Sequence, residues 1–199
     1  MSVELETKPP PRFEPGQLGL RVLLAGVLAW FGITLGSVAG LLYFVLPVIA
    51  AGAISSTGGA GYLQDVAPQL RTVLVWFVRC EAYFLLLVDR FPTADETGAV
   101  ATELRFTGTP TLGSALVRIV TSLPSACVLA VLAIPCVPLW VVMAMFILAG
   151  AEMPPALLAY QRGVLRWQLR LFAYHASLVA EYPPWHFHAD APLAQVVMP

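Results

Sequence analysis

Two long stretches without charge constrain what this chain can fold into more than any other feature. No Asp, Glu, Lys or Arg occurs from Val22 to Gln64 or from Ile119 to Ala151. Each stretch is longer than the ~20 apolar residues that a helix needs to cross a bilayer. With 58% hydrophobic and 12% charged residues, the chain has too few polar groups to cover a water-exposed surface. The sequence therefore predicts an all-α integral membrane protein.

An internal repeat predicts how that protein is built. The segment Arg71–Pro92 recurs as Arg162–Pro183 at a constant offset of 91, with ten identical positions of 22. The most informative matches are Trp76/Trp167, Arg79/Arg170, Tyr83/Tyr174 and Pro92/Pro183. Matches of these residue types in one register are hard to obtain by chance. We expect two tandem repeats, each a long transmembrane helix followed by a second helix that is either amphipathic or spanning.

Changes in composition divide the chain into five parts. We assign residues 1–19 to a polar, proline-rich N-terminal tail, 20–92 to the first membrane repeat, 93–111 to a soluble linker, 112–185 to the second membrane repeat and 186–199 to a C-terminal tail. The first tail is expected to be extended or poorly ordered because its prolines block a continuous helix. In the linker, Val100, Thr102 and Leu104 share one side of an extended chain, which predicts a short strand.

The apolar stretches leave some helix limits open. Residues 22–54 fit either one long tilted helix, bent near Pro47, or an interfacial turn that leads into a spanning helix. Residues 55–61, SSTGGAG, predict a turn. In the second repeat we expect a short helix that ends before Pro124, then one spanning helix over 125–148 that contains Pro135 and Pro138.

Three glycines predict a helix-packing surface. Gly32, Gly36 and Gly40 recur every four residues, so on one helix they form a ridge of small residues. Such a ridge lets a second helix backbone approach closely. The alternative is that glycine is simply common in membrane helices.

The repeated motif places an arginine between two aromatic side chains on each second helix. One helical stripe holds Trp76, Arg79 and Tyr83, and the other holds Trp167, Arg170 and Tyr174. An arginine in an apolar helix is costly unless it reaches the headgroups or finds a partner. In one interpretation each arginine anchors its helix at the interface, with Trp and Tyr in the aromatic belt. In the other, Arg79 and Arg170 face a shared cleft and hold a lipid phosphate or an acidic group of a partner.

The sequence contains no pattern typical of an enzyme. We find no phosphate-binding glycine loop, nucleophile elbow or zinc signature, and we expect neither catalysis nor a cofactor. The three cysteines lie in apolar segments and are expected to be buried hydrophobic residues. His186 and His188 form the one local histidine pair, which is weak evidence for a metal site. A net charge of −1 leaves no basic surface for nucleic acid.

These residues resemble an uncharacterised bacterial membrane family that is known only as a domain of unknown function. The unit of that family has a short strand, an arginine-bearing helix with an internal proline, a long apolar helix and a Trp-x-x-Arg-x-x-x-Tyr helix that ends in Tyr-Pro-Pro. The second repeat matches through Leu104–Pro110, Arg118, Pro124, Trp167, Arg170, Tyr174 and Tyr182–Pro184. The first matches through Trp76, Arg79, Tyr83 and Asp89–Pro92, but lacks the internal proline and a clear opening strand.

The resemblance implies an integral membrane protein of two units, of actinobacterial or similar type, and supplies no catalytic residues. We expect an accessory or scaffold subunit of a larger membrane complex, because the predicted spans lack the polar residues that a transport pathway needs. The alternative is a lipid-binding or transport component that uses Arg79 and Arg170 as headgroup contacts. The distribution of Lys and Arg predicts a multi-pass protein of the bacterial inner membrane with cytoplasmic termini.

Overall fold

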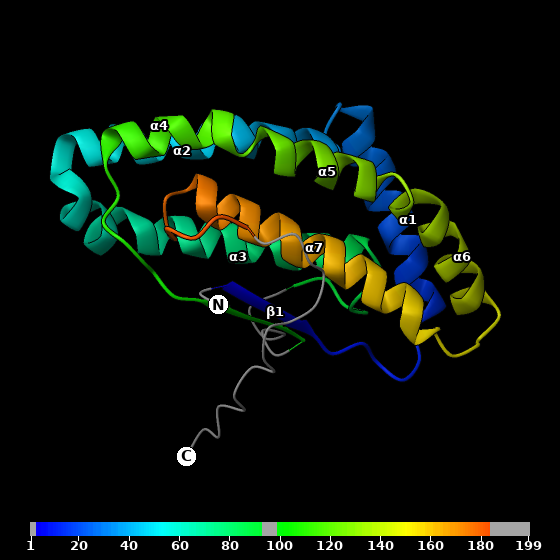
Figure 1. The fold of residues 1–199 in the computed structure, drawn as a ribbon. Coiled ribbons are helices and arrows are strands. Elements are labelled where there is room, and N and C mark those ends of the chain that lie inside the picture. The colour runs from blue at the N-terminus through cyan, green and yellow to red at the C-terminus, as the bar shows by residue number, and fades with distance from the viewer. Residues whose placement is uncertain (1–2, 93–98, 184–199) are drawn as a thin grey trace, which may run out of the picture.

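The computed structural model describes residues 3–92 and 99–183 and is mostly helical (Figure 1). Its elements, in chain order, are β1 (Val3–Thr7), α1 (Pro15–Trp30), α2 (Leu35–Gly61), the π-helical turn η1 (Tyr62–Val66), α3 (Ala67–Phe84), β2 (Val100–Leu104), α4 (Leu112–Thr121), α5 (Leu123–Ala133), α6 (Cys136–Leu148) and α7 (Pro155–His175).

The elements form three layers. Helices α2, α4 and α5 make the first layer, and they contact α7 in the second layer, where α7 lies beside α3 (Figure 1). The third layer is a sheet of two strands, in which β1 contacts α7 and β2 contacts α3. Helices α1 and α6 contact each other at one end of the molecule. The core lies between the first two layers and includes Leu46, Ala50, Leu74, Val78, Leu165 and Leu169.

The two central helices run in opposite directions. The rings of Phe77 and Phe172 lie 6.1 Å apart, and farther along α3 the side chain of Gln168 donates to the carboxylate of Glu81 at 2.8 and 2.9 Å. Residue numbers therefore rise along α3 as they fall along α7. The strands are also antiparallel, with Leu5 opposite Thr102.

The N-terminal segment is more ordered than expected. Residues 3–7 are extended, as predicted, but they pair with β2 as a strand, and α1 already begins at Pro15, where proline fits the first helical turn. The predicted strand in the linker is confirmed by β2. Strand formation by β1 could not be read locally, because its pairing partner lies about a hundred residues away in the chain.

The structure corrects three predicted helix limits. Of the two alternatives for residues 22–54, the single long helix is wrong, because the chain turns at residues 31–34 and Thr34 caps α2 with Ser37. The segment 55–61 is not a free turn, because α2 continues through it with a kink at Gly58, whose φ of 74° suits glycine. In the second repeat, Pro135 separates α5 from α6, so 125–148 is two helices in place of one.

Length and composition make two helical stretches candidates for membrane spans. They are Leu35–Phe84, which combines α2, η1 and α3, and Leu123–Leu148, which combines α5 and α6. Both stretches are mainly exposed in the isolated chain, with 33% and 22% of their most apolar windows buried. This exposure distinguishes them from core helices of a water-soluble protein and supports a membrane location.

Candidate functional site

The two repeated helices end in the same way. After α3, the N–H of Leu86 donates to the carbonyl of Tyr83, and the N–H of Leu87 donates to that of Ala82. The corresponding donors after α7 are Ser177 and Leu178, which bond to Tyr174 and Ala173. This is a Schellman motif, in which one residue adopts the left-handed conformation that glycine usually occupies. Here Leu86 and Ser177 adopt it, with φ values of 59° and 55°.

An arginine from another helix binds each of these helix ends. In the N-terminal Arg–Tyr cluster, Arg21 of α1 donates to the carbonyls of Val88 and Asp89, both at 2.5 Å. Its guanidinium carbon lies 4.3 Å from the centre of the Tyr83 ring, and Nη2 lies 3.7 Å from the Asp89 carboxylate. Both carbonyls belong to the segment that follows α3, so Arg21 holds this segment against α1.

The C-terminal Arg–Tyr cluster has the same geometry. Arg118 of α4 donates to the carbonyls of Tyr174 at 2.5 Å and Val179 at 2.7 Å. Its guanidinium carbon again lies 4.3 Å from the ring centre of a tyrosine, Tyr174. Arg21 and Arg118 are 8% exposed or less, so both arginines serve to hold helix ends inside the protein.

Three arginines on α7, the arginine row, bind strand β1. Arg170 donates to the Val3 carbonyl, Arg166 to the Leu5 carbonyl at 2.9 Å, and Arg162 to the Thr7 hydroxyl at 2.8 Å. Four residues of helix rise ~6 Å and two residues of strand rise ~6.8 Å, so the two spacings nearly coincide when helix and strand are antiparallel. Arg170 also pairs with the buried Glu4 carboxylate at 3.1 Å.

The six aromatic and arginine residues of the repeated motif do not share one environment. Trp76 is 56% exposed, whereas Trp167 is 3% exposed. Arg79 is half-buried, and its Nε has no hydrogen-bond partner within the described part of the chain. Arg170, Tyr83 and Tyr174 instead contact Glu4, Arg21 and Arg118 respectively. The structure thus gives Arg170 an acidic partner within its own chain.

The three glycines fall on two elements. Gly32 lies in the turn between α1 and α2 with a φ of 74°, so it cannot belong to the predicted ridge. Gly36 and Gly40 lie on the first turns of α2 and are exposed. A Cβ added at Gly40 would meet nothing within 4 Å, so no helix of the described chain packs closely there.

A buried polar cluster links α2, α4 and α7. The Tyr43 hydroxyl lies 3.0 Å from the Ser122 hydroxyl, which also contacts Nε2 of His175. Burial lowers the pKa of His175 to about 4, so the imidazole is neutral at neutral pH. Ser122 and His175 are both 0% exposed, so a substrate cannot reach them. Their contacts are those of an interhelical hydrogen-bond network.

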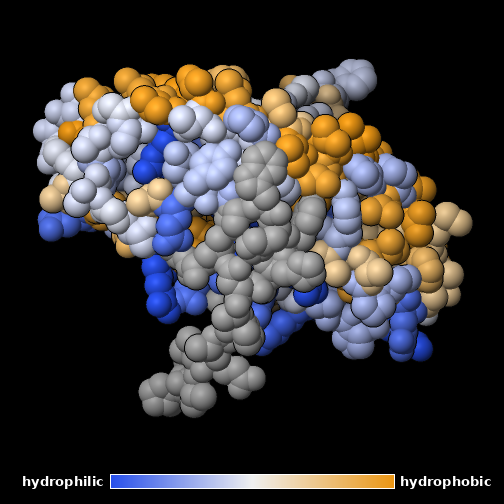
Figure 2. Space-filling view, in the orientation of Figure 1, coloured by the Kyte–Doolittle hydropathy of each residue, from blue (hydrophilic) through white to orange (hydrophobic). Residues whose placement is uncertain are grey.

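A charge-free apolar surface covers the outside of α1, α2, α4, α5 and α6. Twenty-four large apolar side chains between residues 20 and 49 or 112 and 148 are exposed, among them Leu23, Phe31, Phe44, Leu116, Val120, Val131, Val141 and Met145. Figure 2 shows this surface along the top of the molecule and down the side formed by α6, while hydrophilic residues gather on the opposite side. A contiguous patch of this kind marks a membrane or protein interface.

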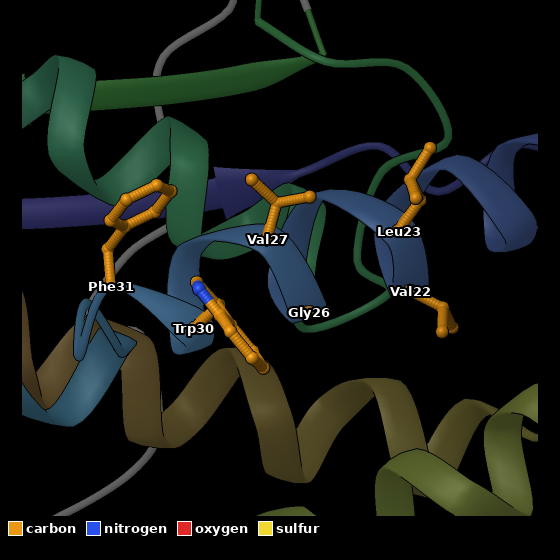
Figure 3. Close-up of a pocket in the computed structure, with 6 residues that line it drawn as sticks. All are labelled: Val22, Leu23, Gly26, Val27, Trp30 and Phe31. Atoms are coloured by element: carbon orange, nitrogen blue, oxygen red, sulfur yellow. The ribbon is translucent and has the colours of Figure 1, made fainter.

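One open depression lies within this apolar surface. It is lined by Val22, Leu23, Gly26, Val27, Trp30 and Phe31, all from the end of α1. Figure 3 shows Leu23 and Val27 on one side of this helix and Val22 and Trp30 on another. Because Trp30 is 84% and Phe31 73% exposed, the depression is part of the apolar surface and not an enclosed ligand site.

Sequence reasoning missed two sets of residues, although each left a signal. Arg21 and Arg118 each precede a stretch without charge and lie 97 positions apart, and strands β1 and β2 share that offset. The arginine row was visible as arginines at every fourth position of one helix. His186 and His188 lie outside the described residues.

One family model matches the C-terminal part of the chain. Residues 113–186 match the model of a family described as a domain of unknown function, DUF4389. This segment contains α4 to α7 and the C-terminal Arg–Tyr cluster. The predicted resemblance to an uncharacterised domain is confirmed for this part of the chain. No curated protein and no solved structure matches the chain.

Proposed function

We propose that the chain is a non-catalytic integral membrane protein that acts as an accessory or scaffold subunit of a larger membrane complex. The observation that carries this proposal is the apolar surface, on which 24 large apolar side chains are exposed. Twenty of them lie in the stretches without charge, 22–64 and 119–151. In water, exposed apolar area costs about 25 cal/mol per Å². Lipid removes this cost.

We also propose that the chain arose from two tandem copies of one membrane unit. The two Arg–Tyr clusters support this, because both match in the tyrosine, in the left-handed residue and in one carbonyl acceptor, Val88 or Val179. Strands β1 and β2 also pair symmetrically, since Val3 faces Leu104 and Thr7 faces Val100. Both features follow if each unit contributes one strand and one arginine.

The alternative of lipid binding through Arg79 and Arg170 has less support. Arg170 is 3% exposed and ion-paired with Glu4 at 3.1 Å, so a headgroup would have to displace a buried carboxylate. Arg79 is half-buried and more accessible, but the buried Arg170–Glu4 pair would have to open before both arginines could bind one headgroup.

Membrane association is tested first. The full chain, expressed in a bacterial host, should float with the membrane fraction and resist extraction by alkaline carbonate, because the apolar surface holds it in lipid. Release of the folded chain into the soluble fraction would overturn the proposal.

The scaffold role is tested by substitution on α2. Gly40→Leu places a bulky side chain on the exposed first turns of this helix, and the matched control Gly52→Leu places one on a different side of the same helix. Both positions are open, with nothing within 4 Å of an added Cβ, so neither variant should unfold the chain. We expect Gly40→Leu to reduce the size of the complex in mild detergent and Gly52→Leu to leave it unchanged. A wild-type chain that runs alone at native expression would contradict a subunit role.

A further inference from the structure

The path of the chain between α3 and α4 constrains how the helices can lie relative to a membrane. Helix α3 ends at Phe84, whose carbonyl accepts a hydrogen bond from Trp140 of α6 at 2.7 Å. Helix α4 begins at the other end of the molecule, where Pro110 lies against Gly59 of α2. The chain must therefore return along the whole length of the central helices before α4 starts.

That return path is polar and contains the sheet. Strand β2 carries Glu103, which pairs with Arg105 at 2.5 Å, and strand β1 carries Glu4 and Glu6. The arginine row fixes the sheet along α7, because it contacts β1 at Val3, Leu5 and Thr7 in turn. Sheet and helix therefore lie side by side over the length of the strand.

The sheet has edges that lipid cannot accommodate. The Lys8 N–H donates to the Ala99 carbonyl at 2.9 Å, so by antiparallel alternation the backbone groups of Val3, Leu5 and Thr7 point away from β2. Arg170 and Arg166 satisfy the carbonyls of Val3 and Leu5. On the outer side of β2, the described part of the chain places no strand. An unsatisfied backbone group in hydrocarbon costs several kcal/mol, so open sheet edges do not occur there.

We infer that the protein inserts from one side only, with α2, α3 and α7 parallel to the membrane plane. The apolar surface of α1, α2, α4, α5 and α6 then lies among the acyl chains of one leaflet, and the sheet faces water. If α3 and α7 instead crossed the bilayer, the sheet and the arginine row beside them would lie at membrane depth. This inference rests on the proposed membrane function and replaces multi-pass topology with one-sided insertion.

A lipid leaflet fits the apolar surface better than a second copy of the chain does. The surface continues over the top of the first layer and down α6, so it faces more than one direction (Figure 2). A second protein would cover one of these faces, whereas acyl chains surround all of them. The thickness also agrees, because one layer of helices is ~10 Å thick and one leaflet supplies about 15 Å of hydrocarbon. Trp76 and Arg79 of α3 then come to lie at headgroup depth, where such side chains are favoured.

The experiment compares two positions at opposite ends of the central helices. Asp65 precedes α3 and Glu152 precedes α7, and because these helices are antiparallel the two residues mark opposite ends. Asp65→Cys and Glu152→Cys are made separately in a Cys127→Ala background, since Cys127 is exposed while Cys80 and Cys136 are buried. Right-side-out and inverted membrane vesicles are treated with a membrane-impermeant maleimide.

One-sided insertion predicts that both cysteines are modified in the same type of vesicle. Modification of one cysteine in right-side-out vesicles and of the other in inverted vesicles would show that the central helices cross the bilayer, and would overturn the inference. That result would leave the proposed membrane function intact. The background variant alone, which should remain unmodified until detergent is added, controls for the native cysteines.

Discussion

The two Arg–Tyr clusters are alike, whereas the surroundings of the two motif arginines differ. Arg21 and Arg118 each bind two helix-end carbonyls and lie 4.3 Å from a tyrosine ring. Arg170, by contrast, is buried against Glu4, while its counterpart Arg79 is half-buried and has an Nε without a partner in the described chain. The motif tyrosine therefore contacts an arginine of another helix in both copies, whereas the motif arginine is buried in an ion pair in the second copy alone.

The difference has a physical origin in the strands. Strand β1 presents Glu4 to α7, but the position of β2 that corresponds at an offset of 97 is Ala101. A buried guanidinium needs a carboxylate or carbonyl partner. Of the two motif arginines, Arg170 has such a partner in Glu4 of β1 and can therefore be fully buried. Every residue at or after the end of a helix has a backbone carbonyl, whatever its side chain, so both Arg–Tyr clusters can form. Arginines at equivalent positions keep the same role where backbone carbonyls bind them, and they differ in role where a side chain such as that of Glu4 binds one of them.

Loss of an Arg–Tyr cluster should have the largest effect. Arg118→Met removes the donor to Tyr174 and Val179, and Arg21→Met removes the donor to Val88 and Asp89. Each should lower the free energy of unfolding by about 2–4 kcal/mol, because buried carbonyls lose their partners. Denaturant unfolding in detergent, followed by circular dichroism, measures the change.

The exposed Arg12 provides the control, and Arg12→Met should change the free energy by less than about 0.5 kcal/mol. Unequal losses for Arg21 and Arg118, for instance 3 kcal/mol against none, would break the comparison between the clusters.

The motif arginines should respond unequally. Arg170→Met removes one cationic partner of the buried Glu4 carboxylate and should cost about 2–3 kcal/mol, whereas Arg79→Met should cost less than about 1 kcal/mol. Adding Glu4→Gln to Arg170→Met should recover part of the loss, since the buried charge is then removed. Equal losses at positions 79 and 170 in thermal or denaturant unfolding would contradict the assigned asymmetry.

A third contrast lies at the last residue of each helix, His175 in α7 and Phe84 in α3. Burial lowers the pKa of His175 from 6.5 to about 4, so between these values the unfolded chain binds more protons than the folded one. The contribution of His175 is therefore complete above pH 6.5 and is lost as the pH falls toward 4. At pH 5 the loss should be about 1–2 kcal/mol.

His175→Phe, which copies the residue at the end of α3, should remove this part of the pH dependence. The measurement is the difference in unfolding free energy between pH 7 and pH 5 for both chains. A slope that is identical in the variant and the wild type would show that His175 does not titrate as assigned.

The smallest effect concerns the left-handed residues. Ser177 adopts a φ of 55°, and a non-glycine residue pays about 1 kcal/mol for this conformation. Ser177→Gly should raise the free energy of unfolding by about 0.5 kcal/mol, since its buried hydroxyl has no partner in the described chain. Ser177→Val, with a branched Cβ, should lower it. A loss of stability on introducing glycine, seen as a lower melting temperature, would argue against strain at this position.

Local patterns predicted the elements whose signal is local. The strand Val100–Leu104 was indicated by its alternation, and α3 and α7 were indicated by the repeated segment with its Trp, Arg and Tyr on one helical stripe. A turn within 22–54 was one of two alternatives, but its position at 31–34 was not predicted, because these residues are as apolar as the helices on both sides. Pro135 was placed inside a helix because membrane helices tolerate proline, yet here the chain bends at it.

The sequence alone determined the two stretches without charge, which favour a membrane environment, and the repeated segment, because charge and residue register are properties of the linear chain. Only the tertiary structure decided the tasks of the arginines. In the sequence, Arg166 and Arg170 resemble arginines that anchor a membrane helix at the interface. In the structure they are buried, because β1, more than 150 residues earlier in the chain, supplies a carbonyl and a carboxylate that bind them. Local periodicity cannot encode a partner so distant, since the contact exists only after α7 and β1 have been brought together.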